Sequence, residues 1–509
     1  MAAVPITLLL LGSLLLGVWR PADARQARLT EAVFTAAALL ASLFVRRSIP
    51  STVSFAYLAP ILSSSAAVKL ELSPWSWSLL VAALGFALAQ TLLDGPMDEA
   101  GPKRRSSGWL AYAAVVALSI LAANTLTLIL AWALVISAQS WLLRDRGSLG
   151  TSPWGFLSSL DLAAIVCLLA AEGTFRGGSP ALPGPSLAYA LLVGAGLLRL
   201  GSGLAAGQRT VRNRDALRLG GLTAVSVLAM LSLDFGQQGV QALGGWLVVL
   251  GAGLLFLAGA SWWLAPPGEL RWSAWALALT GAAALAAVAS PADAALAFSA
   301  SGAVLVLAEG MASAGASGTL AGRIGSMLAS LTTAGIPFLV GALVLGVLAV
   351  AGKSGEAAPI GWVGVLGMGA LSSRFLYEAL HSTRGRPAGR PASAVSFIAL
   401  VVTAVLGAVL IVYLQPISPA PSTLAVVVCL GAAAGGTAAL IVAPIEGRSR
   451  LERSLRWPRS LDFSRVARGL EVPIGAAARG VRDLLEGDAS LLWAFVVLMI
   501  GFLLLRGSP

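Results

Sequence analysis

The stretch that decides the fold is SPWSWSLLVAALGFALAQTLL, residues 73–93, followed by the charged DGPMDEAGPKRRSS, 94–107, and the apolar GWLAYAAVVALSILAAN, 108–124. Each apolar run is long enough to cross a hydrocarbon core of roughly 30 Å as a helix. The alternation continues along the chain, which has about sixteen apolar stretches, mostly 17 to 25 residues long. The pattern predicts an all-α, polytopic transmembrane helical bundle of about 14–16 helices.

The first five helices are predicted at 2–18, 30–46, 73–93, 108–124 and 125–142, with the boundary between the last two at Ala123-Asn124. Residues 48–72 are only moderately apolar and contain Pro50 and Pro60, so we expect an external loop or an interfacial piece there. The later helices are predicted at 154–171, 186–205, 217–232, 241–265, 271–290, 294–313, 325–351, 359–381, 392–414, 422–443 and 489–506.

Positive charge is distributed unevenly between the gaps that separate these helices. Of 34 Lys and Arg, 26 lie in one alternating set of gaps: 19–30, 94–107, 143–153, 206–218, 264–272, 314–324, 382–391 and 444–488. The other set holds only six: Arg46, Arg47, Lys69, Arg176, Lys353 and Arg506. The positive-inside rule places the arginine-rich gaps in the cytoplasm, so both termini are expected on the opposite side of the cell inner (cytoplasmic) membrane.

The composition excludes an ordinary soluble domain, because 57% of residues are hydrophobic, 11% are charged and the mean hydropathy is +0.86. The net charge of +11 is explained by topology, so we expect the lipid bilayer as a partner and no nucleic acid. The 57 glycines suit close helix approach in a bilayer, or reflect a biased genome. Cys167 and Cys429 lie in separate helices, and His381 is the only histidine, so no disulfide, metal site or cofactor is expected.

Three segments are predicted from these shifts in composition: a transmembrane domain at 1–443, an arginine-rich amphipathic segment at 444–488, and a C-terminal transmembrane helix at 489–509. Arginines mixed with large apolar side chains favour a helix lying flat in the membrane interface. A solvated connector held by neighbouring subunits is the alternative for 444–488.

Ionisable residues inside predicted membrane helices are the candidates for function, because a charge there costs several kcal/mol. Asp161 lies about 10 Å into its helix, at 1.5 Å per residue, and could hold a proton reversibly; a later helix start would leave it near the headgroups. Arg199 either extends to the interface or biases the proton affinity of a nearby carboxylate.

A second group of candidates lies near cytoplasmic helix ends. Arg374, Glu378 and His381 are spaced i, i+4 and i+7 on one helix face, which suits a proton-uptake path, a partner contact or a simple intrahelical pair. Side chains that extend to the interface explain all three, and Glu309 receives the same interpretation. No catalytic residue is expected.

Three motifs together point to a known family. They are NTLTLILAWAL at 124–134, VGAGLLRLG at 193–201 and LTTAGIPFLVG at 331–341. Their order and spacing resemble the antiporter-like membrane subunits of respiratory complex I (NADH-quinone oxidoreductase), Mrp-type cation/proton antiporters and membrane-bound hydrogenases. The resemblance covers nearly the whole chain and implies inverted five-helix repeats with broken helices. The motif positions are Asn124, Trp132, Ala133, Gly335, Pro337 and Gly341.

The chain departs from this family at the residues that carry its chemistry. The family's fifth-helix glutamate corresponds to Ala133, and its Pro and His after the seventh-helix cation correspond to Leu204 and Ala206. The lysines Lys69, Lys103 and Lys353 are all predicted outside the hydrocarbon. Either another carboxylate, such as Asp161, takes over proton transfer, or the subunit has become a scaffold.

The resemblance implies a subunit that works with other membrane subunits in a hetero-oligomeric, ion-translocating oxidoreductase or hydrogenase complex, with no catalytic redox site of its own. The alternatives are a non-conducting structural subunit of such a complex and an unrelated secondary transporter.

Overall fold

The computed structural model describes residues 3–19, 24–55, 68–93 and 102–143, most of 161–171, parts of 191–199, residues 248–260 and several short pieces between 281 and 406. The elements of the first four stretches are α1 (Val4–Trp19), α2 (Ala24–Val45), the 3₁₀ turn η1 (Arg46–Ser48), β1 (Ser51–Phe55), β2 (Val68–Leu72), α3 (Pro74–Leu93), α4 (Pro102–Ile120) and α5 (Thr125–Leu143). The five predicted helices are confirmed.

Two helices begin earlier than expected, and local sequence explains both. α2 begins at Ala24 instead of residue 30, because its first residues, Ala-Arg-Gln-Ala, favour helix. α4 begins at Pro102 instead of residue 108, because proline has a backbone angle already suited to the first helical position. Charged residues counted as parts of loops therefore lie in the first turns of these helices.

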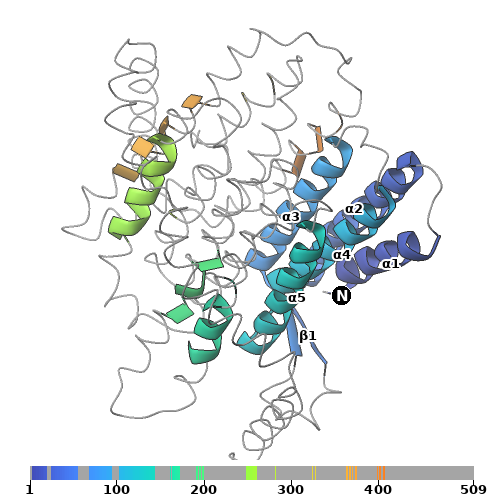
Figure 1. The fold of residues 1–509 in the computed structure, drawn as a ribbon, viewed down its shortest axis with the longest axis horizontal. Helices are drawn as coiled ribbons and strands as arrows, with labels where there is room; N and C mark the ends of the chain where they lie inside the picture. Colours follow the sequence, from blue (N-terminus) through green and yellow to red (C-terminus); the bar gives the residue numbers. More distant parts are fainter. Residues whose placement is uncertain are drawn as a thin grey trace, which may run out of the picture.

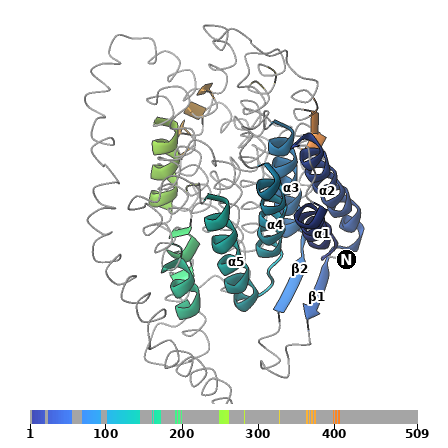
Figure 2. The same cartoon turned by 45° about the vertical axis from the view of Figure 1, so that its right-hand side comes forward.

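The connection between α2 and α3, expected to be a loop, contains an antiparallel β-hairpin. β1 pairs with β2 from Ser51 opposite Leu72 to Phe55 opposite Val68. The hairpin also bonds to the turn between α4 and α5: the Glu71 N–H donates to Leu121 O (2.8 Å), and the Ala123 N–H donates to Lys69 O (3.0 Å). β2 is thereby fixed to the end of the bundle where α4 ends and α5 begins (Figure 2).

Helices α1 to α5 lie side by side in one bundle (Figure 1). α1 packs against α2 and α4, α2 against α3, and α4 against α5. A glycine permits the contact between α1 and α2, because a Cβ on Gly12 would lie 2.5 Å from Cγ of Phe34. The Ser13 hydroxyl donates to Ser107 O at 2.8 Å, which joins α1 to α4.

The exposed side chains of the bundle suit lipid and would not suit water. α3 is buried at every residue from Ser76 to Thr91, whereas α1 and α2 expose apolar side chains such as Val18, Val33 and Phe44. A large exposed apolar surface marks contact with a membrane or a partner. Among the described residues, Gln26–Ser48 is long and apolar enough to span a membrane, and shorter apolar helices include Val4–Trp19, Ser76–Leu92, Ser107–Ile120, Thr125–Ala138 and Val248–Ala260.

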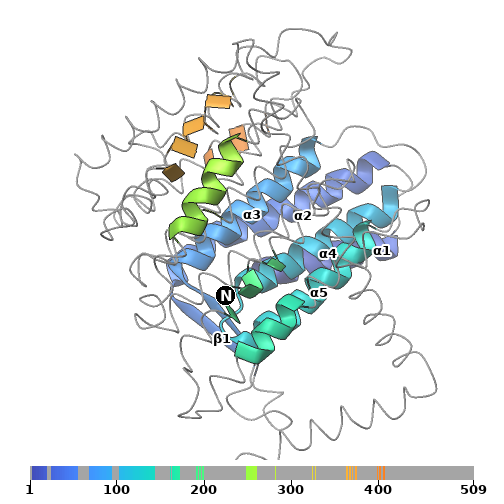
Figure 3. The ribbon, with the colours of Figure 1, turned by 60° about the vertical axis from the view of Figure 1, so that its left-hand side comes forward.

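Small residues also permit close contact in the later part of the chain. Helix Val248–Ala260 lies against the described residues of 363–374 (Figure 3). A Cβ on Gly259 would lie 2.5 Å from Gly367 O, and a Cβ on Gly367 would lie 2.5 Å from Leu255 O. The expected use of glycine for backbone approach is confirmed at these positions. The predicted segments 444–488 and 489–509 lie outside the described residues.

Candidate functional site: a buried aspartate–arginine pair

Asp161 and Arg199, two candidates separated by 38 positions in the sequence, meet in the structure. The Arg199 guanidinium donates from Nη1 to Asp161 Oδ1 at 2.6 Å. Both side chains are buried, with exposed fractions of 2% for Arg199 and 8% for Asp161. Neither the Asp161 carboxylate nor the Arg199 guanidinium therefore reaches the surface of the protein.

Along the chain, the buried residues next to each member of the ion pair are apolar or small. Ala164 and Leu168, in the turns that follow Asp161, are fully buried. Leu192 and Ala195, in the turns that precede Arg199, are buried as well. A charge pair among such residues is poorly solvated, so each charge depends on the other for stabilisation.

Tyr112 is the third ionisable residue of the site. It comes from the middle of α4, is fully buried, and lies close enough to Arg199 and Asp161 to interact with both charges. A tyrosine hydroxyl can donate one hydrogen bond and accept others. The group therefore joins a carboxylate, a guanidinium and a phenol from three separate parts of the chain.

The two charged groups of the site, the guanidinium and the carboxylate, differ in whether they can exchange a proton. The arginine guanidinium keeps its proton under all ordinary conditions. A carboxylate can take up and release a proton, and protonation of Asp161 would remove the negative charge that Arg199 pairs with. The pair therefore combines one group of a kind that exchanges protons with one group that stays charged.

The remaining ionisable candidates come from later parts of the chain. Arg374 is buried, with 6% of its surface exposed, so it does not reach the surface as its interfacial interpretation required. Its neighbour Ser373 donates from its hydroxyl to Ala370 O at 2.8 Å. Glu309, Glu378 and His381 lie outside the described residues.

The family-motif positions on α5 have structural roles. Asn124 caps the helix, because its Oδ1 accepts hydrogen bonds from the Thr127 N–H (2.9 Å) and hydroxyl. The Thr127 hydroxyl oxygen also accepts from the Lys69 N–H at 2.9 Å, which ties α5 to β2. Trp132 is fully buried, whereas Ala133 lies on the exposed face of α5. Gly335, Pro337 and Gly341 lie outside the described residues.

Among the described residues, two buried ionisable side chains lie outside the candidates that the sequence predicts. Tyr112 was hidden in an apolar helix, although the chain has only five tyrosines. Glu31 was placed at a helix start, but α2 begins at Ala24, which puts Glu31 about two turns inside the helix. Glu31 is buried at 7% exposure and accepts a hydrogen bond from the Thr91 hydroxyl at 2.9 Å. The helix-favouring residues 24–27 are the sequence signal for an earlier start of α2, and that start would have identified Glu31 as an interior helix residue.

The chain resembles known proteins in structure and not in sequence. Neither a protein-family model nor a curated protein matches the sequence. Solved structures do match. A chain of the Mrp complex from Dietzia sp. DQ12-45-1b is similar at a TM-score of 0.74 and 16% identity, over 99% of this chain. This chain spans 62% of the length of that Mrp chain.

Chains of two respiratory complexes have a similar fold. One belongs to the membrane-bound sulfane sulfur reductase, an archaeal respiratory membrane complex, with a TM-score of 0.65 and 14% identity over 98% of this chain and 99% of that one. The other belongs to respiratory complex I from Thermus thermophilus, with a TM-score of 0.64 and 16% identity over 86% of this chain and 99% of that one. This chain therefore has the fold of the antiporter-like membrane subunits, as its motifs predicted.

Proposed function

We propose that this chain is a membrane subunit of an ion-translocating complex, related to the proton-translocating antiporter-like subunits, in which Asp161 is the proton-carrying residue. The observation that carries the proposal is the buried hydrogen-bonded pair of Asp161 and Arg199, with Tyr112 nearby. The likeness in fold to chains of Mrp and respiratory complexes supports the setting.

The proposed cycle needs only one titrating residue. In the resting state the Asp161 carboxylate accepts a hydrogen bond from Arg199. A proton arriving from one side of the membrane binds the carboxylate and neutralises it, so the attraction to Arg199 falls. The neutral carboxyl group then turns toward the other side and releases its proton, and the carboxylate returns to Arg199.

A non-conducting structural subunit is the second candidate, and one observation favours it. Arg199 cannot release a proton, and its bond to Asp161 is short and buried, so the pair can act as a permanent brace between two helices. The alanine at position 133 supports this alternative, because the residue that corresponds to the family glutamate supplies no carboxylate. An unrelated secondary transporter gains no support from the likeness in fold.

Several finer features belong to the same proposal. We propose inverted five-helix repeats, a broken helix at Gly335–Pro337, an arginine-rich interfacial segment at 444–488 and a last membrane helix at 489–509. The protein would lie in the inner membrane with both termini on the non-cytoplasmic face. Its partners would be other membrane subunits, which supply any redox chemistry.

Proton flux in proteoliposomes that contain the full chain separates the two candidates. Under the conducting proposal, wild-type protein carries protons faster than empty vesicles, and Asp161→Asn reduces the flux to the vesicle background. Glu71→Gln, which neutralises a half-buried carboxylate on β2, is the matched control and keeps the wild-type flux. Wild-type flux equal to that of empty vesicles supports the structural subunit.

Arg199→Lys adds a sharper test of the site. A lysine keeps the positive charge beside Asp161 but can release its proton when buried. If Asp161 is the proton carrier, the lysine variant conducts at least as fast as wild type. Equal flux in wild type and Asp161→Asn, above background, would place the proton path elsewhere and overturn the assignment of Asp161.

A further inference from the structure

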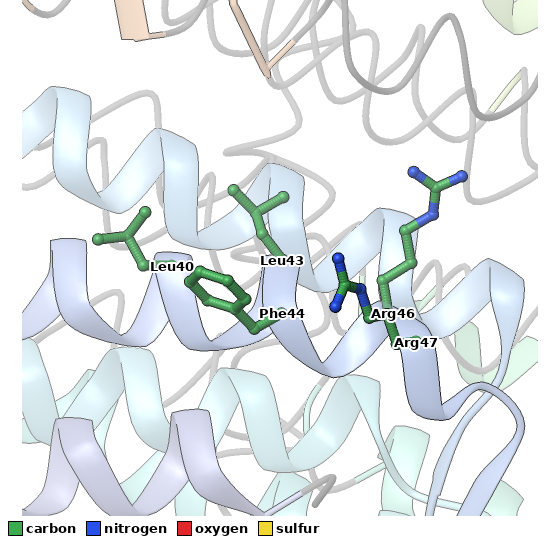
Figure 4. Close-up of a pocket in the computed structure, with 5 residues that line it drawn as sticks. All are labelled: Leu40, Leu43, Phe44, Arg46 and Arg47. Atoms are coloured by element: carbon green, nitrogen blue, oxygen red, sulfur yellow. The ribbon is translucent and has the colours of Figure 1, made fainter.

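A cleft on the outer side of α2 has features that neither the ion pair nor the family motifs explain. It has a volume of about 540 Å³ and is lined by Leu40, Leu43, Phe44, Arg46 and Arg47 (Figure 4). We call the cavity that these five residues line the α2 cleft. Figure 4 shows the three apolar side chains preceding the two guanidinium groups along the helix.

Along the axis of α2, the apolar side chains of the cleft come first and the two cationic side chains follow. Leu40 and Phe44 stand at i and i+4 on one face of α2, and Arg47 follows in the 3₁₀ turn η1. Leu40 and Phe44 are exposed, with 55% and 73% of their surfaces accessible. Over about 10 Å along the axis, this face changes from apolar to positively charged.

The position of the cleft matches the edge of a bilayer. α2 has 22 residues. At 1.5 Å per residue it extends about 33 Å, close to the hydrocarbon thickness of roughly 30 Å. Leu40 and Phe44 therefore fall beside the acyl chains, and Arg46 and Arg47, directly after the last residue of α2, fall at the level of the phosphates.

Arg46 is held in position by neighbouring residues. Its guanidinium carbon lies 5.6 Å from the ring centroid of Trp77. The Trp77 ring is fully buried, and its indole N–H donates to Ser42 O at 2.8 Å, which fixes the ring against α2. A guanidinium preorganised on an aromatic ring loses less freedom when it binds an anion.

The charge pattern of the sequence makes this pair of arginines unusual. The gaps of the arginine-poor set hold six basic residues in total, and Arg46 and Arg47 are the only two that are adjacent. The general bias therefore does not explain them. Among the lining residues that the structure describes, two are cationic and none is acidic, so this part of the cleft is complementary to an anion.

We propose that the α2 cleft binds one anionic glycerophospholipid, with its phosphate between Arg46 and Arg47 and an acyl chain along Leu40 and Phe44. Arginine recognises phosphate through two parallel hydrogen bonds. A phospholipid has the same order of groups as the cleft, from apolar chain to charged phosphate. This proposal does not depend on whether Asp161 carries protons.

The test measures the preference for spin-labelled phosphatidylglycerol over spin-labelled phosphatidylcholine around the purified full chain in vesicles. The wild-type protein is expected to prefer the anionic lipid. Arg46→Gln/Arg47→Gln lowers that preference by about five-fold for each arginine lost. Lys69→Gln, an exposed cation on β2 outside the cleft, is the matched control and leaves the preference unchanged.

Two further variants keep the test decisive if the double variant folds poorly. Arg47→Gln alone leaves the contact between Arg46 and Trp77 and is expected to lose about five-fold. Phe44→Ala weakens retention of both lipids because it removes contact with the acyl chain. Added inorganic phosphate, which lacks the chain, should not displace the labelled phosphatidylglycerol.

The proposal is overturned if the double variant and Arg47→Gln both keep the wild-type preference. It is also overturned if free phosphate displaces the lipid. A third contrary outcome is that the variants lose a co-purifying membrane subunit while the lipid preference stays unchanged, since the α2 cleft would then be a protein contact.

Discussion

Arg199 carries a charge that it cannot release, so a negative charge close to it stabilises its buried position. Asp161 supplies that charge at 2.6 Å. A lysine at the same position could discharge itself instead. Because the charge on Arg199 is permanent, the Asp161 carboxylate contributes to stability, whether or not it also carries protons.

The first prediction concerns this dependence. Asp161→Ala should lower the free energy of unfolding by about 3–5 kcal/mol, because it leaves the Arg199 charge buried without its carboxylate. Asp161→Leu/Arg199→Met removes both charges and should recover most of the loss. Reversible unfolding in mixed detergent measures both values.

The control for this cycle is Glu71→Ala, which removes a half-buried carboxylate from β2 and should change stability by less than about 0.5 kcal/mol. A double variant as unstable as Asp161→Ala would show that the charges are not coupled, and would contradict the prediction.

At the scale of elements, the helices are held together by small contact residues and by polar ends. α1 approaches α2 at Gly12 because a larger residue would overlap the Phe34 ring. The polar ends are joined through the hairpin, where β2 bonds to the turn between α4 and α5. Both devices satisfy backbone groups or fill space without adding charge, as a lipid-facing bundle requires.

The second prediction compares two glycines of the same helix. A Cβ on Gly12 would lie 2.5 Å from Phe34, whereas a Cβ on Gly17 would meet nothing within 4 Å. Gly12→Ala should therefore destabilise the protein by about 1–3 kcal/mol through overpacking. Gly17→Ala should be neutral or stabilise by up to about 1 kcal/mol, because alanine favours helix.

Thermal unfolding of both variants in detergent provides the comparison. Equal unfolding temperatures for Gly12→Ala and Gly17→Ala would mean that α1 and α2 are not in close contact at Gly12.

At the scale of the whole molecule, the described parts of the arginine-rich and arginine-poor gaps between α2 and α5 lie at opposite ends of the bundle. β2 and the turn between α4 and α5 share one end, and α3 and α4 run from that end and back. The basic start of α4, with Lys103 and the two arginines after it, consequently lies at the other end. The uneven distribution of basic residues between gaps in the sequence therefore corresponds to a difference between the two ends of the bundle.

The third prediction assigns these ends to the two sides of the membrane. With the native cysteines Cys167 and Cys429 replaced by serine, Lys69→Cys should react with an impermeant maleimide added outside intact cells. Arg104→Cys should react only after the membrane is permeabilised, because arginine-rich gaps face the cytoplasm. Labelling of both positions from outside would contradict the assigned orientation.

The sequence by itself determined the class of fold, because apolar runs of membrane length and the spacing of arginines depend only on local composition. It also indicated the antiporter-like fold through three short motifs, and it singled out Asp161 and Arg199. It did not show the hairpin, because residues 48–72 have no strong period, nor the inward position of Glu31, because the start of α2 was misjudged.

Tertiary structure alone decided which residues meet. The bond between Asp161 and Arg199 spans 38 positions, and Tyr112 comes from a third part of the chain. Contacts at such separations depend on how helices pack, and packing is set by shape across the whole bundle. The same packing places Ala133 on an exposed face and makes Arg46 and Arg47 part of the lining of a cleft.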